Sequence, residues 1–594
     1  QFNLGIIFRT HERFSSKRAL SHSLLEKAAE SGIGEAQYYV GLNYLEGNEV
    51  SIDLDKAREN LFKSSEQEHK FQYLAQYELG KIYFLGNGID RDIEKARPLL
   101  ESSAARGCKE AQYLLSVLYG AEEKENVFSP KSLEFLKKSA EQGYPQAQSD
   151  YACRLFDGIG VPRNYPLALK MFRLSAEAGI VASLENLAIL HLSHDSKLTD
   201  PILGKEYLLK AIEKGSVLAL RFLAYNYKTG EFLERNLGES LKYYRMASER
   251  GDADSTCAIA EFFLNGIEVE KDVHEGIRLY NLAYEQGSLP ALFELACIYL
   301  SGTDGVPKDE KHGFELLKKA VEGGEPNSQF MYGMYLRNRR SEDRNLDLKK
   351  SFELIESSAK SGYRASQFLL GSIYEYGDEV VAQDLRESLY WYKEAFYNGS
   401  QEAAVTLGTW YLFGKGVEQN SENALKFFLE AAKSGTVEAY YLIWVVYELD
   451  NAKISMNLST AFNWLCLAVE HGYTPALVKF GILLYEGLYI NQNRADAFVI
   501  FEHTAKYNDP DSLYYLSLYY ENGEVVSQDD EEALRLLTAS ADLGLHKAQI
   551  ALGFRYLNGR GVTKDTEKAN FLFKCAANQG DKWAQELVEQ LKNK

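Results

Sequence analysis

Two histidines separated by two residues are the side chains best suited to metal chemistry in this sequence. His191 and His194 occur in the segment HLSHD, directly before Asp195. Imidazole nitrogens and a carboxylate are ligands that zinc accepts. A single histidine pair beside one aspartate is more often a polar turn, and so we expect no metal and no cofactor here.

The spacing of the cysteines and the absence of known catalytic motifs indicate no reactive centre. The cysteines are Cys108, Cys153, Cys257, Cys297, Cys466 and Cys575. They show no short spacing and no CxxC pair, which predicts small buried side chains rather than disulfides or a zinc site. The sequence also lacks a phosphate-binding loop, a GxSxG elbow and an HExxH motif. We therefore expect a protein that is not an enzyme.

One basic run stands out in an acidic chain. Residues 337–350 read RNRRSEDRNLDLKK and place Arg337, Arg339 and Arg340 close together, in a chain of formal net charge -19. Most charged runs are solvated surface, which is the first interpretation. The alternatives are a docking site for an acidic partner and a seam where the curvature of the array changes.

Length and composition favour a soluble array of small units. The chain has 594 residues, of which 45% are hydrophobic and 25% are charged. A single core rarely supports this length, whereas a repeat array can. No run of eighteen apolar residues predicts a membrane span. The negative charge disfavours nucleic acid and anionic membranes as partners.

The sequence repeats with a period of 36 residues, and each unit opens with a small residue. Five residues after each start stands another small residue in fourteen of fifteen units, and a tyrosine often follows three residues later. This spacing predicts a first helix that packs closely on a second. The unit starts are Ala36, Ala75, Ala111, Ala147, Ser183, Ala219, Ser255, Ala291, Ser328, Ser366, Ala403, Ala439, Ala476, Ser512 and Ala548.

Capping residues predict where the second helix of each unit begins and ends. An Asp or Asn precedes a small residue by four positions, and such side chains accept N–H groups of the first helical turn. A glycine, or Asn508 in one unit, closes the hairpin. The predicted caps are Asp53, Asp92, Ser129, Asn164, Asp200, Asn236, Asp272, Asp309, Asp347, Asp384, Asn420, Asn457, Asn493, Asp529 and Asp565.

The repeated pattern AxxxLGxxYxxG, then GV, a capping Asp, KA and AAxxG resembles the Sel1-like repeat, which is related to the tetratricopeptide repeat. The match is strongest over 75–107, 147–179, 403–435 and 548–580. The resemblance implies an all-α fold, a right-handed superhelical solenoid of about 16 helix hairpins. It also implies an adaptor or assembly scaffold and brings no catalytic residues with it.

The same template predicts the domain organisation. Residues 1–583 form one continuous solenoid, and residues 584–594 form a C-terminal capping helix. Because residues 1–35 fit the template with its beginning missing, we expect an upstream segment, which could include a signal peptide. The compartment stays open between an exported or periplasmic bacterial location and the cytoplasm, and the oligomeric state stays open as well.

Large aromatic residues predict a binding patch. In the related solenoids the first helices line the groove that grips partners. Trp410 and Trp444 fall on first helices, and Trp444 replaces a small residue. Our hypothesis is an anchor patch of Phe368, Trp410, Tyr441 and Trp444, with core packing as the alternative. Trp391 and Trp464 occupy the position of Leu61 and Phe172 in other units, which predicts core packing.

The leading prediction is a protein-interaction scaffold or adaptor that binds a partner protein or peptide along the concave surface of the solenoid. One alternative is a regulatory subunit whose catalytic partner is another chain. The other is an exported, envelope-associated enzyme that acts on a cell-wall or peptide substrate.

Overall fold

The computed structural model describes residues 1–10, 18–48, 50–121, 129–193, 198–303, 305–339, 343–450 and 457–592. These residues form α-helices joined by loops, and within them one isolated β-bridge joins Thr303 and Val306. The all-α prediction is therefore confirmed. The chain divides into two units near α17, and each unit is described by itself.

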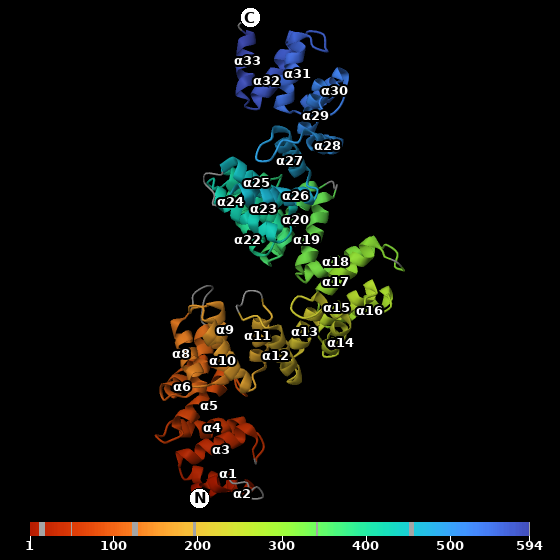
Figure 1. Cartoon of the computed structure of the whole chain (residues 1–594). Coiled ribbons are helices and arrows are strands. Elements are labelled where there is room, and N and C mark those ends of the chain that lie inside the picture. Colours follow the sequence, from red (N-terminus) through yellow and green to blue (C-terminus); the bar gives the residue numbers. More distant parts are fainter. Residues whose placement is uncertain are drawn as a thin grey trace. The chain divides into compact units, whose positions relative to one another are not determined.

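The helices pair in chain order into hairpins, as Figure 1 shows. The first unit contains α1 (Phe2–Thr10), α2 (Arg18–Glu30), α3 (Gly34–Glu46), α4 (Leu54–Ser65), α5 (Gln72–Leu85), α6 (Ile93–Ala105), α7 (Lys109–Ala121), α8 (Pro130–Glu141), α9 (Pro145–Asp157), α10 (Tyr165–Glu177), α11 (Val181–His191), α12 (Pro201–Glu213), α13 (Val217–Thr229), α14 (Leu237–Ser248), α15 (Ala253–Asn265) and α16 (Val273–Glu285).

The chain continues through α17 (Pro290–Ser301) into the second unit. This unit contains α18 (Glu310–Glu322), α19 (Pro326–Asn338), α20 (Arg344–Lys360), α21 (Arg364–Tyr376), α22 (Leu385–Tyr397), α23 (Gln401–Phe413), α24 (Ser421–Lys433), α25 (Val437–Asp450), α26 (Leu458–Glu470), α27 (Thr474–Glu486), α28 (Arg494–Thr504), the short 3-10 helix η3 (Ala505–Tyr507), α29 (Pro510–Asn522), α30 (Asp530–Asp542), α31 (His546–Asn558), α32 (Thr566–Asn578) and α33 (Lys582–Lys592).

The predicted caps of the second helices are confirmed in every unit except one. Asp53, for example, accepts the Lys56 backbone N–H at 3.0 Å, and Asn420 accepts that of Asn423 at 2.9 Å. The prediction for Asp347 is wrong. Asp343 caps α20, and because this helix starts one turn earlier, Asp347 lies inside it.

Where the small residue of a first helix is a glycine, it lies against the second helix, as predicted. A Cβ added to Gly408 would come within 2.5 Å of the Phe428 ring. The helix backbones are close enough for a serine of α20 to reach across, because Ser351 Oγ donates to the Gly333 carbonyl at 2.7 Å. The small residue therefore makes room both for a large side chain and for a hydrogen bond between helices.

A second serine ties the two ends of a hairpin together. Ser139 Oγ at the end of α8 donates to the Lys109 carbonyl at the start of α7, at 2.7 Å. Such a bond satisfies one buried hydroxyl and adds about 1 kcal/mol. The same contact recurs at Ser64, Ser103, Ser175, Ser358 and Ser540.

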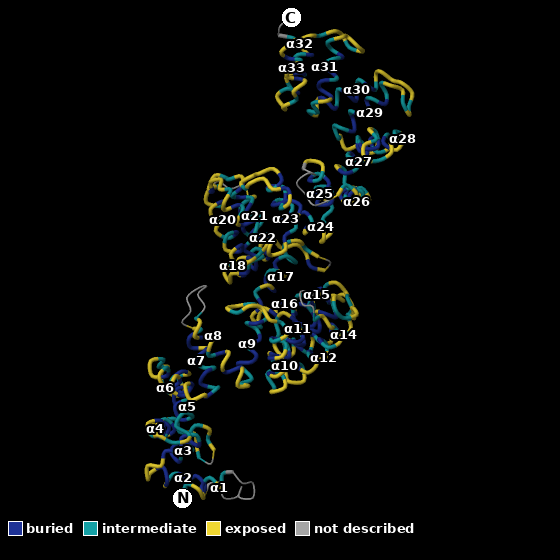
Figure 2. The backbone as a smooth tube through the Cα atoms, turned by 60° about the vertical axis from the view of Figure 1, so that its left-hand side comes forward, coloured by how far each residue is buried: buried dark blue, intermediate teal, exposed yellow. Residues whose placement is uncertain are grey.

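Apolar clusters form between neighbouring hairpins, so that a hairpin shares its core with the next. One cluster joins α24, α25, α26 and α27 around Phe428, Trp444 and Leu465. Figure 2 shows buried segments along the helices and exposed residues at many of the loops. Stability in such an array depends on nearest neighbours.

Trp391 and Trp464 pack against these clusters, but one position away from the predicted place. Tyr392, not Trp391, is the ring that a Cβ on Gly371 would meet, at 2.7 Å. In the other hairpin Leu465 is fully buried, whereas Trp464 is partly buried. In both units the cap of the second helix, Asp384 or Asn457, stands 18 residues after the unit start instead of the usual 17, which shifts the register by one residue.

Candidate protein-binding groove

Neighbouring first helices meet at a recurring contact, which we name a joint. Each joint pairs two residues. The first stands two positions after the start of its unit, and the second stands three positions before the start of the next unit. Tyr113 and Tyr144 form such a joint with ring centroids 5.2 Å apart. In the second unit, Phe330–Tyr363 and Tyr441–Tyr473 are joints with centroids 5.4 Å and 5.7 Å apart. We call these aromatic joints.

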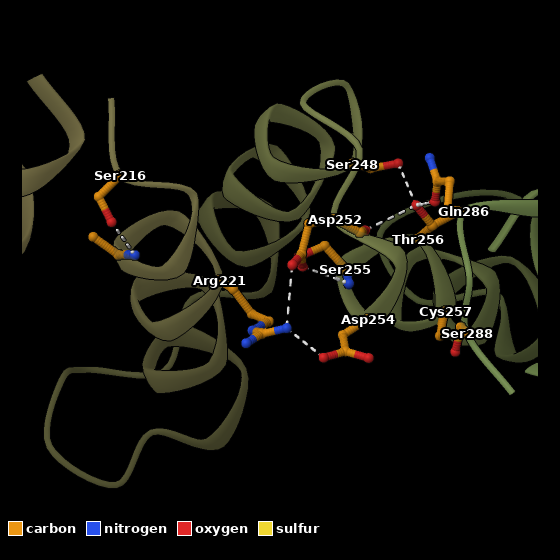
Figure 3. Close-up of polar contacts among 11 residues, drawn as sticks. Ser216, Arg221, Ser248, Asp252, Asp254, Ser255, Thr256, Cys257, Gln286 and Ser288 are labelled. Carbon is orange, nitrogen blue, oxygen red and sulfur yellow. Dashed lines mark hydrogen bonds and ion pairs between the residues drawn. The ribbon is translucent and has the colours of Figure 1, made fainter. Parts of the chain in front are cut away.

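Three successive joints of the first unit, between α11 and α17, are polar instead. Ser216 Oγ donates to Glu185 at 2.6 Å, and the Arg221 guanidinium contacts Asp252 at 3.1 Å and also Asp254. Figure 3 shows the Arg221 contacts and, farther along, Cys257 beside Ser288. Side chains of the chain itself thus fill these polar joints.

Two consecutive joints of the second unit are open. Phe368 faces Ser400, and Val405 faces Thr436, so that a small hydroxyl side chain stands where the aromatic joints have a tyrosine. Two hollows of about 580 Å³ and 620 Å³ lie at these open joints. Both hollows are lined by Phe368, Ser372, Gln401 and Glu402, and we name them together the trough.

The walls of the trough are successive first helices. Phe330 and Met334 of α19 lie at one end, and Glu438 at the start of α25 lies at the other. Between them, α21 contributes Phe368 and Tyr376, and α23 contributes Val405 and other side chains. The trough therefore spans four repeats of one unit.

A buried carboxylate lies in the wall of the trough. Glu375 accepts a hydrogen bond from the Tyr392 hydroxyl at 2.6 Å and pairs with Lys415. Burial, followed by the hydrogen bond to Glu375, raises the pKa of Tyr392, which therefore stays protonated as a donor. The Lys415 ammonium lies 5.7 Å from the Trp410 ring and 5.3 Å from the Tyr376 ring.

The structure places the four predicted aromatic residues differently. Phe368 lines both hollows of the trough, and Tyr441 is half-buried against Tyr473. Trp410 is only 2% exposed, although it borders the trough. Trp444 is 0% exposed, and a partner cannot touch it. The four residues therefore do not form a single exposed patch.

The burial of Trp444 has a physical cause. A large ring at the close-packing position must find space, and it packs edge-on against Phe462 and Tyr489, with centroids 6.1 Å and 5.8 Å away. Tyr489 has a positive φ of 65°, as Glu268 and Gly416 have at the same position of their repeats. A core role for Trp444 was the alternative interpretation, and the geometry favours it.

The predicted basic cluster is partly neutralised. Arg337 pairs with Asp378 at 2.5 Å, and both side chains are mostly buried. Burial alone would raise the pKa of Asp378, but the Val380 and Val381 N–H groups and Arg337 outweigh it and hold that pKa below its ordinary value. Arg339 is exposed, and Arg340 lies outside the described residues.

Metal and thiol chemistry find little support where the structure is described. His191 Nδ1 donates to the Leu198 carbonyl at 2.7 Å, and His194 is not among the described residues. No group of three or more potential metal ligands occurs in the described ranges. Burial, followed by Asp150 and Asp157, raises the pKa of Cys153 to about 11, which disfavours a reactive thiolate.

Sequence reasoning missed Glu375, Tyr376, Tyr392 and Lys415. One signal could have found part of this set. An acid nine residues after a unit start pairs with a cation of the next unit in three places, namely Glu375–Lys415, Glu448–Lys479 and Glu521–Arg555.

Tandem helix hairpins that stack through such joints define an α-helical repeat protein. The model of the Sel1 repeat matches residues 34–69, 74–108, 109–144, 145–180, 182–216, 217–252, 253–288, 289–325, 326–363, 364–400, 401–436, 510–545 and 546–581. The chain belongs to the Sel1 repeat family. Proteins with this repeat generally mediate protein–protein interactions.

Two curated relatives are similar over short segments. Chitin synthase regulator SKT5 of Saccharomyces cerevisiae is 32% identical over 98 residues, which is 16% of this chain and 14% of the relative. Chitin synthase regulatory factor 3 of Schizosaccharomyces pombe is 32% identical over 109 residues, which is 18% of this chain and 12% of the relative. The chain thus matches less than one sixth of either relative.

Two solved structures are also similar. The protective antigen c5321 of uropathogenic Escherichia coli, which displays an SLR fold, is 26% identical with a TM-score of 0.45, covering 77% of this chain and 94% of that one. A Sel1 repeat protein of Oxalobacter formigenes is 25% identical with a TM-score of 0.27, covering 59% and 90%. Among the helices of the described ranges, none combines the length and apolarity needed to cross a bilayer.

Proposed function

We propose that the protein is an interaction scaffold that binds a segment of a partner protein in the trough. The observation that carries this proposal is the pair of open joints, where Phe368 and Val405 face only Ser400 and Thr436. In the aromatic and polar joints described above, the chain fills the same position with its own side chains. An apolar side chain of a partner can take the place of the missing rings.

The contacts around the trough support such a role. Burying one large apolar side chain contributes about 1.5–3 kcal/mol, and a binding site needs few such anchors. The aromatic joints Phe330–Tyr363 and Tyr441–Tyr473 lie on either side of the open joints along the chain and hold the helices in place. A wall that is already ordered loses little entropy when a partner binds.

Site-specific photocrosslinking tests the proposal. A benzophenone amino acid replaces Val405 in the trough of the full chain, and the same amino acid replaces Tyr390 in a matched control. Tyr390 lies on the second helix of the preceding hairpin and is exposed. In lysate of the native host, we expect a defined crosslinked partner from position 405 and none from position 390. Equal yields at both positions would refute the trough as the binding surface.

A second candidate is regulation of an enzyme by the bound scaffold. The observation that favours it is the name of the two curated relatives, which are chitin synthase regulators. In this case the crosslinked partner would be an enzyme or part of its complex, and adding the purified chain would change the rate of that enzyme. If the rate of that enzyme does not change at a saturating concentration of the purified chain, regulation is contradicted and only the scaffold function stands.

A further inference from the structure

One ion pair lines the trough, and its cation is the more exposed of the two charged side chains. The Lys415 and Glu375 charges lie 2.5 Å apart. The Lys415 side chain is 44% exposed, whereas that of Glu375 is 5% exposed. The carboxylate is thus enclosed by protein, and the ammonium is the partner that reaches solvent. Within this pair, an incoming ligand can reach the ammonium more easily than the Glu375 carboxylate.

Two aromatic rings and the carboxylate fix the position of that ammonium. The rings of Trp410 and Tyr376 each lie within 6 Å of it, which is the range of a cation–π contact. An ammonium has three N–H donors, and Glu375 accepts from one of them. The group therefore keeps donor capacity for an acceptor that enters the trough.

The apolar part of the trough lies beside this cation. Val405 and Trp410 belong to the same helix, α23, and line the same hollow as Lys415 and Phe368. The Thr406, Thr409 and Thr436 side chains complete the lining with hydroxyl groups. One ligand segment can thus reach the apolar surface and the ammonium together.

The acidic groups of the trough limit the ligand to one negative charge near Lys415. The Glu402 backbone N–H, the Ser400 hydroxyl and the nearby Arg364 hold the pKa of Glu402 low, and this carboxylate stays ionised. Glu438 is exposed at the start of α25 and lines the hollow of Lys415. A strongly acidic ligand would be repelled by these two carboxylates.

We infer that the occupant is an internal segment of a partner protein with one apolar side chain and, close to it, one Asp or Glu side chain. The apolar side chain packs on Phe368 and Val405 in place of the missing ring. The carboxylate accepts a hydrogen bond from the Lys415 ammonium. This inference rests on the proposed function, because it specifies the ligand of the same trough.

Selection from a random library tests the inference directly. Dodecapeptides displayed on phage, with their carboxyl ends fused to the coat protein, are selected on the full chain and depleted on the Thr436→Tyr variant. The selected peptides are then synthesised with acetylated and amidated ends. We expect each to contain an apolar residue near a single Asp or Glu. Changing that acid to its amide should weaken binding about tenfold, as expected for one charge-assisted hydrogen bond.

Variants of the chain assign the effect to Lys415. Lys415→Gln alone would leave Glu375 buried without its cation, and so the test variant is the double change Glu375→Gln/Lys415→Gln. It should bind the acidic peptide and its amide form equally. The matched control is Lys228→Gln/Glu261→Gln in the first unit, where a lysine also pairs with a glutamate and lies near an aromatic ring. This control should preserve the tenfold preference.

The possible results separate the two proposals. Peptides that depend on the open trough but bind equally as acid and amide would overturn the charge inference and keep the proposed function. A preference for Lys or Arg in the peptides would also overturn it. If no peptide distinguishes the chain from Thr436→Tyr, both proposals fail.

Discussion

The polar joints between α11 and α17 and the open joints between α21 and α25 use the same positions of the repeat for opposite purposes. In the polar joints Arg221 and Glu185 are held by Asp252 and Ser216, and the chain satisfies itself. In the open joints Phe368 and Val405 lack such partners across the joint. The comparison teaches that the fold leaves this position free to vary, and that a binding site can arise where the chain leaves it unfilled.

Filling the open joint should have the largest effect. Thr436→Tyr supplies the ring that Tyr473 and Tyr363 provide at the same position of other repeats, and we expect it to weaken partner binding on the order of 100-fold. The matched change Ser288→Tyr falls at a polar joint and should alter affinity less than twofold. Fluorescence polarisation with a selected peptide measures both. Equal losses would mean that the two regions do not differ in function.

Removing one partner should destabilise the fold more at an aromatic joint than at a polar joint. Phe330→Ala deletes a half-buried ring and should lower the free energy of unfolding by about 2 kcal/mol. Arg221→Ala removes a partly exposed ion pair and should lower it by at most about 1 kcal/mol. Urea denaturation and hydrogen exchange at the adjacent helices measure both effects. A larger loss for Arg221→Ala would reverse our ranking of the joints.

A reciprocal exchange in the loops should change stability in opposite directions. Glu268 and Gly416 occupy the same repeat position and both have positive φ, 56° and 68°. Because only glycine adopts this conformation freely, Glu268→Gly should stabilise the first unit by about 1 kcal/mol. Gly416→Glu should destabilise the second unit by at least as much, since a Cβ there would lie 3.1 Å from Trp410. Thermal unfolding with segment-resolved hydrogen exchange distinguishes the two.

The smallest effect should be a loss of folding stability when the pH is lowered. The pKa of Asp378 is lower in the folded chain than in the unfolded chain, so its ion pair with Arg337 stabilises the fold above the ordinary Asp pKa of about 4. This contribution, about 1 kcal/mol or less, is lost as the pH falls from there through the folded pKa. Asp378→Asn should flatten that part of the pH profile of stability. An unchanged profile would mean that the pair contributes nothing.

The hairpins could be predicted from the sequence because their signals are local. A cap such as Asp53 and a close-packing glycine such as Gly408 act within one unit, and the period repeats them. The prediction for Asp347 was wrong because the extra residues of this unit extend α20 by a turn at its start, where Asp343 is the cap. The predicted position of Trp391 was wrong by one residue. One extra residue in the loop places Tyr392, and not Trp391, at the position of Leu61 and Phe172.

The trough could be predicted only in part. Phe368 was found because large residues on first helices attract notice. The hollow itself depends on two small side chains, because Ser400 and Thr436 leave it open. A small residue gives no signal when one repeat is read by itself. Trp444 misled the prediction because its size suggested an anchor, whereas its neighbours Phe462 and Tyr489 enclose it.

The sharing of each core between neighbouring hairpins limits how the second unit can be shortened. A version that ends after α24 would leave Phe428 and the rest of its cluster without α25, which normally covers them. Such a bare flank matches an identical flank on another copy, and the trimmed chains would pair or precipitate. Helix α33 offers a remedy, since it buries Ala584 and Val588 and exposes Lys582, Gln585, Glu586 and Glu589. A shortened version of this array should therefore end with an added helix that has one apolar face to bury and one polar face exposed to solvent.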